Sequence, residues 1–159
     1  MERLEWARNS IIWLAIEPMP DPDLRILVRF LPEFERPDFS PGDWSPMQQA
    51  EDGTYTMPYV TLSPVVEEFV QAAYDGGWVL CNFDWPKWKE TEEAITLYRD
   101  PDALTRATPH QLAQLLTVFI RQDRFVEGAL LDDVKSGHVL AILRRAAELL
   151  GSGEPSSEC

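Results

Sequence analysis

The sequence predicts a mainly α-helical protein: one compact domain of about six helices, with an irregular aromatic and Pro-rich loop and little strand. Apolar residues recur at helical spacing in most segments outside residues 32–62. Two segments begin with a capping residue followed by proline, Ser63-Pro64 and Thr108-Pro109, which is the order expected where a helix starts. The chain has 159 residues and is 45% hydrophobic, which is enough to bury a core within one domain.

Two helices are expected before the loop. Residues 3–16 carry the first, which ends where Pro18 and Pro20 prevent helix continuation. Asp21 is predicted to cap the second, with Pro22 at its first position. Its apolar stripe is formed by Leu24, Leu27, Val28 and Leu31.

Residues 32–62 differ from the rest, because five prolines interrupt any long element. Asp52-Gly53 predicts a turn, and residues 54–57 predict a short strand after it. The aromatic side chains of this loop indicate that it packs onto the helices. We expect three of them to anchor it there, namely Phe34, Trp44 and Tyr59.

Further helices are expected at residues 64–75, 87–98, 109–120, 125–135 and 138–150. Residues 78–82 form an apolar run that predicts either a strand or a buried turn. Thr108 and Gln111 stand in the spacing of a capping box, which is the clearest helix start in the chain. We expect the domain to cover residues 1–150, followed by a flexible tail at residues 151–159.

The formal net charge is −13, and the acidic residues are unevenly distributed. Residues 21–100 hold 16 Asp and Glu against 6 Lys and Arg, a difference of −10. Residues 101–150 hold 6 of each kind. A direct nucleic-acid binder is disfavoured, because phosphate binding needs clustered Lys and Arg. The acidic charge either serves solubility or steers the protein toward a basic partner.

Compartment and redox state follow from what the sequence lacks. Cys81 and Cys159 have no metal-ligand spacing and no expected disulfide. The N-terminal residues lack a signal-peptide pattern, and no apolar run reaches the roughly 18 residues of a membrane span. We therefore expect a cytoplasmic protein without membrane association.

A charged cluster follows the helix at residues 109–120 and is the most informative part of the chain. Its candidate ligand-binding residues are Arg121, Asp123, Arg124, Glu127 and His138. Burial of an unpaired ion is costly, so these groups must pair, reach water or hold a ligand. Asp123 and Glu127 share a face if the helix is continuous, and Arg124 is expected to pair with Glu127 and to be at least half-buried.

Three interpretations of this cluster remain open. It is an ion-pair network joining two helices, a pocket whose arginines bind a phosphate or carboxylate, or a metal site formed by Asp123, Glu127 and His138. The nearby arginines disfavour a metal ion and hold the carboxylates ionised, which also disfavours acid–base catalysis. No metal site and no cofactor are therefore expected.

Residues 83–88 are an aromatic segment with two interpretations. Either Asp84 caps a short helix with Trp85 and Trp88 on one face, or the aromatic rings form a recognition patch. The candidate interaction surface consists of Asp84, Trp85, Trp88, Glu67, Glu68, Glu92 and Glu93. With two His in the chain no nucleophilic triad is evident, and there is no phosphate-binding loop or dinucleotide fingerprint.

The order of these motifs resembles an uncharacterised bacterial family, a domain of unknown function, over about residues 24–148. The resemblance rests most specifically on Phe83-Asp84-Trp85 with Trp88, on Arg121-Gln122-Asp123-Arg124-Phe125-Val126-Glu127-Gly128-Ala129-Leu130, and on Ser136-Gly137-His138 with Ile142-Leu143-Arg144-Arg145. It implies no activity, but it implies that Arg121, Arg124, Glu127 and Gly128 are family features. Family members often have Cys where this chain has Val126, which excludes a thiol nucleophile at that position.

The sequence thus favours a non-enzymatic, acidic protein-interaction module with a basic protein partner. One form of this hypothesis is an inhibitor or regulator that occupies a nucleic-acid-binding surface of its partner, such as a counter-defence protein. The alternative is a small-ligand-binding protein or enzyme that uses the cluster of Arg121, Asp123, Arg124 and Glu127 on a phosphate- or carboxylate-bearing ligand.

Overall fold

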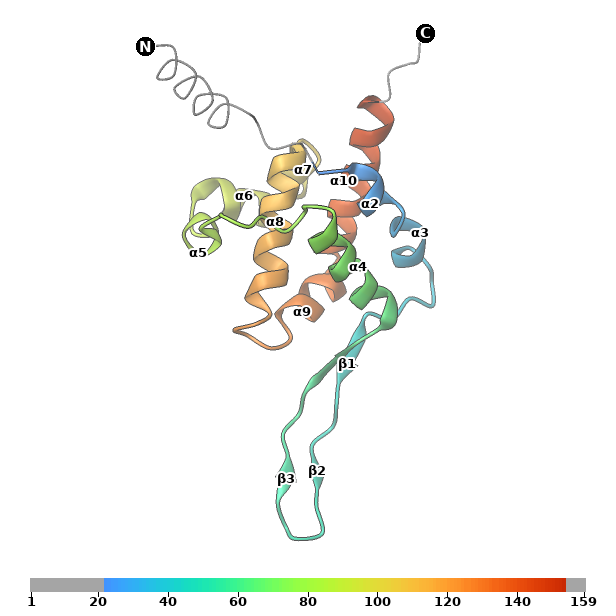
Figure 1. The fold of residues 1–159 in the computed structure, drawn as a ribbon, viewed down its shortest axis with the longest axis vertical. Coiled ribbons are helices and arrows are strands. Elements are labelled where there is room, and N and C mark those ends of the chain that lie inside the picture. Colours follow the sequence, from blue (N-terminus) through green and yellow to red (C-terminus); the bar gives the residue numbers. More distant parts are fainter. Residues whose placement is uncertain (1–21, 154–159) are drawn as a thin grey trace, which may run out of the picture.

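The protein is mainly α-helical, as the sequence predicts, and a long two-stranded β-ribbon projects from one end of the helical body (Figure 1). The computed structural model describes residues 22–153, so the helix expected at residues 3–16 and the cap expected at Asp21 lie outside the described part. The helices are α2 (Leu24–Val28), α3 (Leu31–Phe34), α4 (Pro64–Asp75), α5 (Trp85–Trp88), α6 (Glu92–Arg99), α7 (Pro101–Leu104), α8 (Pro109–Gln122), α9 (Ala129–Lys135) and α10 (His138–Gly153). The strands are β1 (Gly42–Trp44), β2 (Gln48–Gln49), β3 (Tyr55–Thr56) and β4 (Val60–Leu62).

Helix α8 is the centre of the core. Every residue from Leu112 to Ile120 is buried, so this part of α8 is enclosed on all sides. Helices α5, α9 and α10 pack against it, and α10 also packs against α2 and α3. The capping box of Thr108 and Gln111 is present at its start, as predicted.

The loop between α4 and α5 is fixed to the core by buried polar contacts. The Thr117 hydroxyl on α8 accepts a hydrogen bond from the Leu80 backbone N–H at 2.9 Å and donates one to the Ala113 carbonyl at 2.7 Å. The indole N–H of Trp78, whose side chain is fully buried, donates to the Asp23 carbonyl at 3.0 Å. Residues 78–82 form neither a strand nor a fully buried turn, because Trp78 and Val79 are buried whereas Cys81 and Asn82 are exposed.

The N-cap of α2 differs from the predicted one. Asp23 caps α2, where the Arg25 backbone N–H donates to its carboxylate, so the cap lies two residues beyond the predicted Asp21. The apolar stripe divides between α2 and α3. Phe34 is buried as predicted and packs against the Phe69 ring of α4 with centroids 5.4 Å apart.

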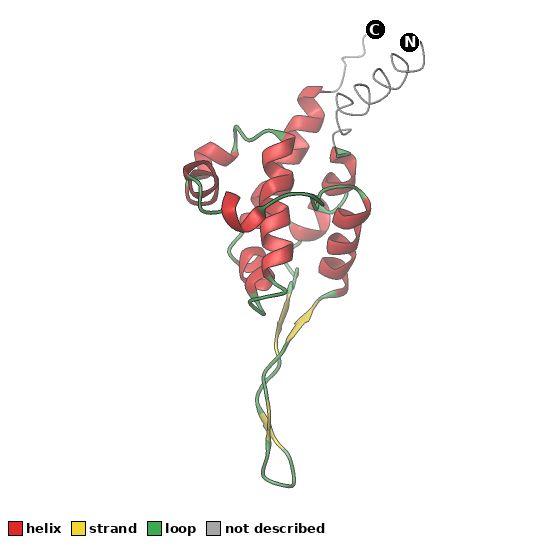
Figure 2. Ribbon diagram, turned by 60° about the vertical axis from the view of Figure 1, so that its left-hand side comes forward, coloured by secondary structure: helices red, strands yellow, loops and turns green. Residues whose placement is uncertain are grey.

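The β-ribbon (residues 42–62) is built on one register throughout. Strand β1 pairs antiparallel with β4, and β2 pairs antiparallel with β3. Counting along either ladder places Pro46 opposite Pro58. Neither proline has a backbone N–H, so the ladder loses its donors on both strands at this point and divides into two short sheets. Figure 2 shows the strong twist between them.

The tip of the β-ribbon is a three-residue turn. The Ala50 N–H donates to the Thr54 carbonyl at 2.7 Å, and Gly53 adopts the left-handed region at φ +87°. The Asp52 carboxylate accepts from the Thr54 N–H and hydroxyl, and these hydrogen bonds lower the pKa of Asp52. The predicted turn and strand are therefore confirmed.

The expectation that the whole Pro-rich loop packs onto the helices is wrong for its distal half. Trp44 at the base is 42% exposed and contacts the body, whereas Tyr55 and Met57 farther out are 61% and 78% exposed. Hydrogen bonds between the two strands satisfy the inward-facing backbone groups, and water can satisfy the outward-facing ones, so the β-ribbon can project without helices beside it.

The helix predicted at residues 87–98 is divided into α5 and α6, α7 was not predicted, and the other helices have shifted ends. Gly76 ends α4 as expected, and α10 continues to Gly153, beyond the predicted end near residue 150. The predicted helix at 125–135 starts later, at Ala129, because residues 123–128 form a turn. Among the helices of residues 22–153, none has both the length and the apolar character that crossing a membrane requires.

Candidate functional site

The charged cluster lies on a turn that joins α8 to α9, and this turn holds the base of the β-ribbon. Helix α8 ends at Gln122, with Asp123 as its C-cap. The Asp123 carboxylate accepts the backbone N–H groups of Gly128 at 3.2 Å and Leu130 at 3.1 Å, and so caps the start of α9. The continuous helix that would have put Asp123 and Glu127 on one face is therefore absent.

Gly128 is required at the end of this turn for two reasons. Its φ is +92°, a conformation that other residues adopt only at a cost. A Cβ atom built on it would lie 2.5 Å from Cζ2 of Trp44, so the indole ring lies directly over the glycine. Trp44 thus reaches the helical body at the one position of the turn that has no side chain.

Two further contacts fix the base of the β-ribbon. Glu127 accepts a hydrogen bond from the Val60 backbone N–H at 2.8 Å, which satisfies an outward-facing donor of β4. Lys135 on α9 lies 3.6 Å from the Asp43 carboxylate on β1, in an exposed ion pair. The turn and α9 therefore serve as a socket for the β-ribbon, defined by Glu127, Gly128 and Lys135.

The predicted pair of Arg124 and Glu127 does not form. Arg124 is exposed, and within residues 22–153 its guanidinium makes no ion pair. Glu127 is also exposed and is directed to Val60 instead. The pairing was expected from helical spacing, and the turn removes that spacing. Arg121, on the last turn of α8, is half-buried, and its buried Nε has no hydrogen-bond partner in the described chain.

His138 lies away from this turn, against α6. Its ring stacks on the Tyr98 ring with centroids 4.1 Å apart and planes 6° apart. Nε2 is 3.1 Å from the Tyr98 carbonyl, and Nδ1 is 2.5 Å from the Ser136 hydroxyl. The contact to the carbonyl requires a proton on Nε2. His138 therefore joins the start of α10 to α6 and does not meet Asp123 and Glu127.

Asp133 on α9 is a titratable residue that sequence reasoning missed. Burial raises the pKa of Asp133 to about 6, although the hydrogen bond from the Tyr98 hydroxyl at 3.3 Å acts in the opposite direction. Its carboxylate lines a pocket between α5, α6, α8 and α9. The only sequence signal for it is an acidic residue close to the apolar face of a short helix.

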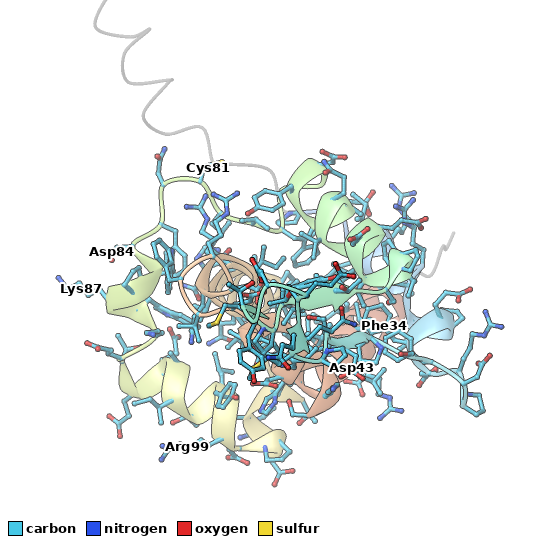
Figure 3. The ribbon with its side chains drawn as sticks, turned by 90° about the horizontal axis from the view of Figure 1, so that it is seen from below. Phe34, Asp43, Cys81, Asp84, Lys87 and Arg99 are labelled. Atoms are coloured by element: carbon cyan, nitrogen blue, oxygen red, sulfur yellow. The ribbon has the colours of Figure 1, made fainter. Side chains whose placement is uncertain are left out.

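The aromatic segment at residues 83–88 takes the first of its two predicted forms. Asp84 caps α5 by accepting the Lys87 backbone N–H at 3.2 Å, and it lies at the outer edge of the body in Figure 3. Trp88 is buried, and its indole N–H donates to Glu93 at 2.9 Å. Trp85 is half-buried, with its ring centroid 6.1 Å from that of Phe125.

The acidic members of the predicted interaction surface divide into two groups. Glu67, Glu68 and Glu92 are exposed and available to a partner. Glu93 instead accepts from Trp88 and from the Gln111 side chain, and these hydrogen bonds lower the pKa of Glu93. Trp88 and Glu93 are thus occupied within the fold.

Within residues 22–153, no three His, Cys, Asp or Glu side chains come together in an arrangement that could hold a metal ion. Asp123 and Glu127 are directed to backbone N–H groups, and His138 is directed to α6. In the part of the chain that the structure describes, the charged cluster therefore joins the β-ribbon to the helices.

The comparisons with known proteins place the chain in a family. The model of the Family of unknown function (DUF6508) matches residues 19–152, and the chain belongs to this family. The search of curated proteins gives no match, and the search of solved structures gives none.

Proposed function

We propose that this member of the DUF6508 family is a non-enzymatic protein-interaction module whose β-ribbon binds a basic surface of a partner protein. The observation that carries the proposal is the set of exposed apolar side chains on the β-ribbon, which projects from the helical body without a partner in the described chain (Figure 2).

Four large apolar side chains of the β-ribbon are exposed. In an antiparallel pair, alternate residues point to the same side, and residues opposite each other point to the same side as well. The register sets Met47 opposite Met57, with Tyr55 toward the tip and Tyr59 toward the base. These side chains are 60%, 78%, 53% and 61% exposed, respectively. Contiguous exposed apolar and aromatic surface is typical of protein-binding sites.

One face of the β-ribbon is fixed to the body at its base. Val60 and Leu62 are half-buried near the base, and Leu62 packs against the core. Trp44 belongs to this face and covers Gly128. Trp44, Val60 and Leu62 thus fix the base of the β-ribbon to the body, and the exposed methionine and tyrosine side chains are presented to a partner. Methionine adapts to irregular surfaces, and tyrosine supplies rigid contact area.

Charge indicates what kind of partner this is. From Pro37 to Pro86 the chain has eight Asp and Glu and no Lys, Arg or His. This segment contains the β-ribbon and α4, where Glu67 and Glu68 are exposed. An acidic surface of this length attracts a basic surface and repels nucleic acid. A nucleic-acid-binding surface of a protein is strongly basic, so an inhibitor or regulator that occupies such a surface is the specific form we propose.

The test is affinity capture from the source cell with the protein and two variants, followed by identification of the bound proteins. The first variant replaces three of the exposed apolar side chains, as Met47→Ser, Tyr55→Ser and Met57→Ser together. The second reverses charge at Glu67→Lys and Glu68→Lys. We expect both variants to lose the same basic partner. Rising salt should lower the association rate constant of the unmodified protein and change the dissociation rate constant less.

A matched control separates this outcome from a general loss of acidity. Asp132→Lys reverses an exposed charge on α9, in the half of the chain where charges balance, and should leave capture unchanged. Competition by DNA or RNA for the captured partner would support the inhibitor form. Capture that is equal for the protein and the Met47, Tyr55 and Met57 variant would contradict the role of the β-ribbon.

A further inference from the structure

A pocket of about 250 Å³ lies on the helical body, between α5, α6, α8 and α9. Its walls are mostly apolar and aromatic, with a few polar groups, and they consist of Trp88, Lys89, Ala94, Ile95, Tyr98, Arg99, Leu115, Val118, Phe119, Gln122 and Asp133. Small-molecule sites combine apolar walls with few polar groups in this way, at volumes of about 300–1,000 Å³. A cavity of about 150 Å³ already accepts benzene. The pocket therefore fits one ring with a short polar arm.

The polar groups differ in how far they lie from solvent. Asp133 is half-buried and hydrogen-bonded by Tyr98, whereas Lys89 and Arg99 are exposed. Figure 3 shows Arg99 at the outer margin of the body. The pocket thus has a carboxylate among its walls and two cations at its rim. Water screens the exposed cations more than it screens the carboxylate.

The aromatic walls suit a positive charge. Trp88, Tyr98 and Phe119 line the pocket, with one face of the Tyr98 ring covered by His138, and the face of an aromatic ring attracts an organic cation. Within residues 22–153 Asp133 forms no ion pair, and His138 on α10 is the basic group whose charge acts on it. Its carboxylate is therefore the group that a bound ammonium would neutralise.

We propose that this pocket binds a small organic amine, with its ammonium group at Asp133 and one apolar ring or short aliphatic body between Trp88, Tyr98 and Phe119. The site lies on helices, apart from the β-ribbon, and does not depend on the proposed function. It supplies the protein with a second binding surface of a different chemical class.

Binding has a defined dependence on pH. The groups that face or surround Asp133 are Tyr98 on α6, His138 on α10, Asp132 on α9 and Asp123 at the end of α8, with Lys89 and Arg99 at the rim. Asp133 must be ionised to attract the ammonium. Affinity should therefore fall as the pH drops below about 6, and bound amine should lower the pKa of Asp133.

The experiment titrates benzylamine into the purified protein at pH 7.5, followed by two-dimensional NMR. We expect saturable shifts at the Trp88 indole N–H, the Gln122 side-chain amide and the Ile95 backbone N–H. Benzyl alcohol, which has the same size without the charge, should bind at least tenfold more weakly. Benzoate should not bind, because its carboxylate would meet Asp133.

Two variants decide the role of the carboxylate. Asp133→Asn keeps the shape and should weaken benzylamine binding by tenfold or more, whereas Asp132→Asn removes the neighbouring exposed carboxylate and should leave it unchanged. Equal binding of benzylamine and benzyl alcohol, equal binding by Asp133→Asn, or no shifts at these three groups would each overturn the proposal. Failure of the proposed partner interaction would show as unchanged capture and leaves these titrations unaffected.

Discussion

At the scale of single residues, the charged cluster that the sequence offered as a candidate ligand site binds backbone N–H groups through its carboxylates. Asp123 accepts two N–H groups of α9, and Glu127 accepts one N–H group of β4. Gly128 provides the left-handed conformation and the space that Trp44 occupies. The charges are arranged to fix the β-ribbon to the helices. Arg124 makes no such contact among the described residues and is free for a partner.

Gly128→Ala should destabilise the protein more than Gly137→Ala does. Both glycines have positive φ, +92° and +91°, so each alanine incurs the left-handed cost of about 1–2 kcal/mol. Only at Gly128 would the new Cβ collide with Trp44, while Gly137 has open space. Overpacking adds typically about 1–3 kcal/mol. Urea denaturation measures both variants, and equal free energies of unfolding would show that Trp44 does not press on Gly128.

Asp133→Asn should stabilise the protein at neutral pH and lose this advantage in acid. Burial raises the pKa of Asp133 from 3.8 to about 6, so the folded state holds this proton more tightly than the unfolded state does. Stability from this group is therefore full below about pH 4 and is lost as the pH rises toward 6. Asparagine removes the buried charge and can still accept from Tyr98.

Thermal denaturation from pH 4 to pH 8 checks this pH dependence. The melting temperatures of the protein and Asp133→Asn should approach each other near pH 4, diverge as the pH rises to about 6 and stay apart at higher pH. Asp132→Asn changes an exposed carboxylate on the same helix and should show no such separation. A lower melting temperature for Asp133→Asn at pH 8 would contradict the expectation.

At the scale of elements, the sequence reveals what is encoded locally. The starts of α4 and α8 were predicted because the proline and the preceding Ser63 or Thr108 act within one turn. Residues 125–128 of the turn were predicted to be helical, because Gly128 was the only local break. The β-ribbon was read as a loop, because its pairing joins residues up to 20 positions apart across two opposed prolines.

In the candidate site too, residues set by local sequence patterns could be predicted, and residues set by tertiary packing could not. Asp84 as a cap could be predicted from its position before Trp85-Pro86, a local pattern. The pocket at Asp133 could not, because its walls come from four helices whose packing no short motif specifies. Likewise, the exposure of Met47 and Met57 depends on the β-ribbon leaving the body, which follows from tertiary structure.

Thr117→Val should cost more stability than Thr117→Ser, because the hydroxyl group joins α8 to the loop before α5. Valine has the same shape but leaves the Leu80 N–H without an acceptor, at a cost of about 1–3 kcal/mol. Serine keeps the hydroxyl and loses one buried methyl group, worth about 1 kcal/mol. Amide exchange at Leu80 should accelerate in Thr117→Val alone. Slow exchange in that variant would mean that Leu80 has another acceptor.

At the scale of the whole molecule, the protein has a helical body that contains the core and a β-ribbon that projects from it. The core lies around α8 and draws on the helices of the body, and no residue from Gly42 to Leu62 belongs to its buried set. The acidic segment without cations runs through the β-ribbon and α4. This separation allows the exposed apolar side chains to be changed without loss of the fold.

Removal of the distal β-ribbon should therefore leave the body folded. Ser45 and Tyr59 are paired, with the Ser45 N–H donating to the Tyr59 carbonyl at 2.7 Å, so an Asn-Gly turn can join them in place of residues 46–58. The base keeps Trp44 on Gly128 and Val60 on Glu127. Since none of the removed side chains is buried, the loss should be within about 1 kcal/mol, or roughly 2–4 °C in melting temperature. Circular dichroism should show the same helical structure as in the full protein. The thermal transition should fall within that range of the transition of the full protein. A drop of 10 °C or more would mean that the β-ribbon stabilises the fold, and its exposed methionines would then need a structural explanation.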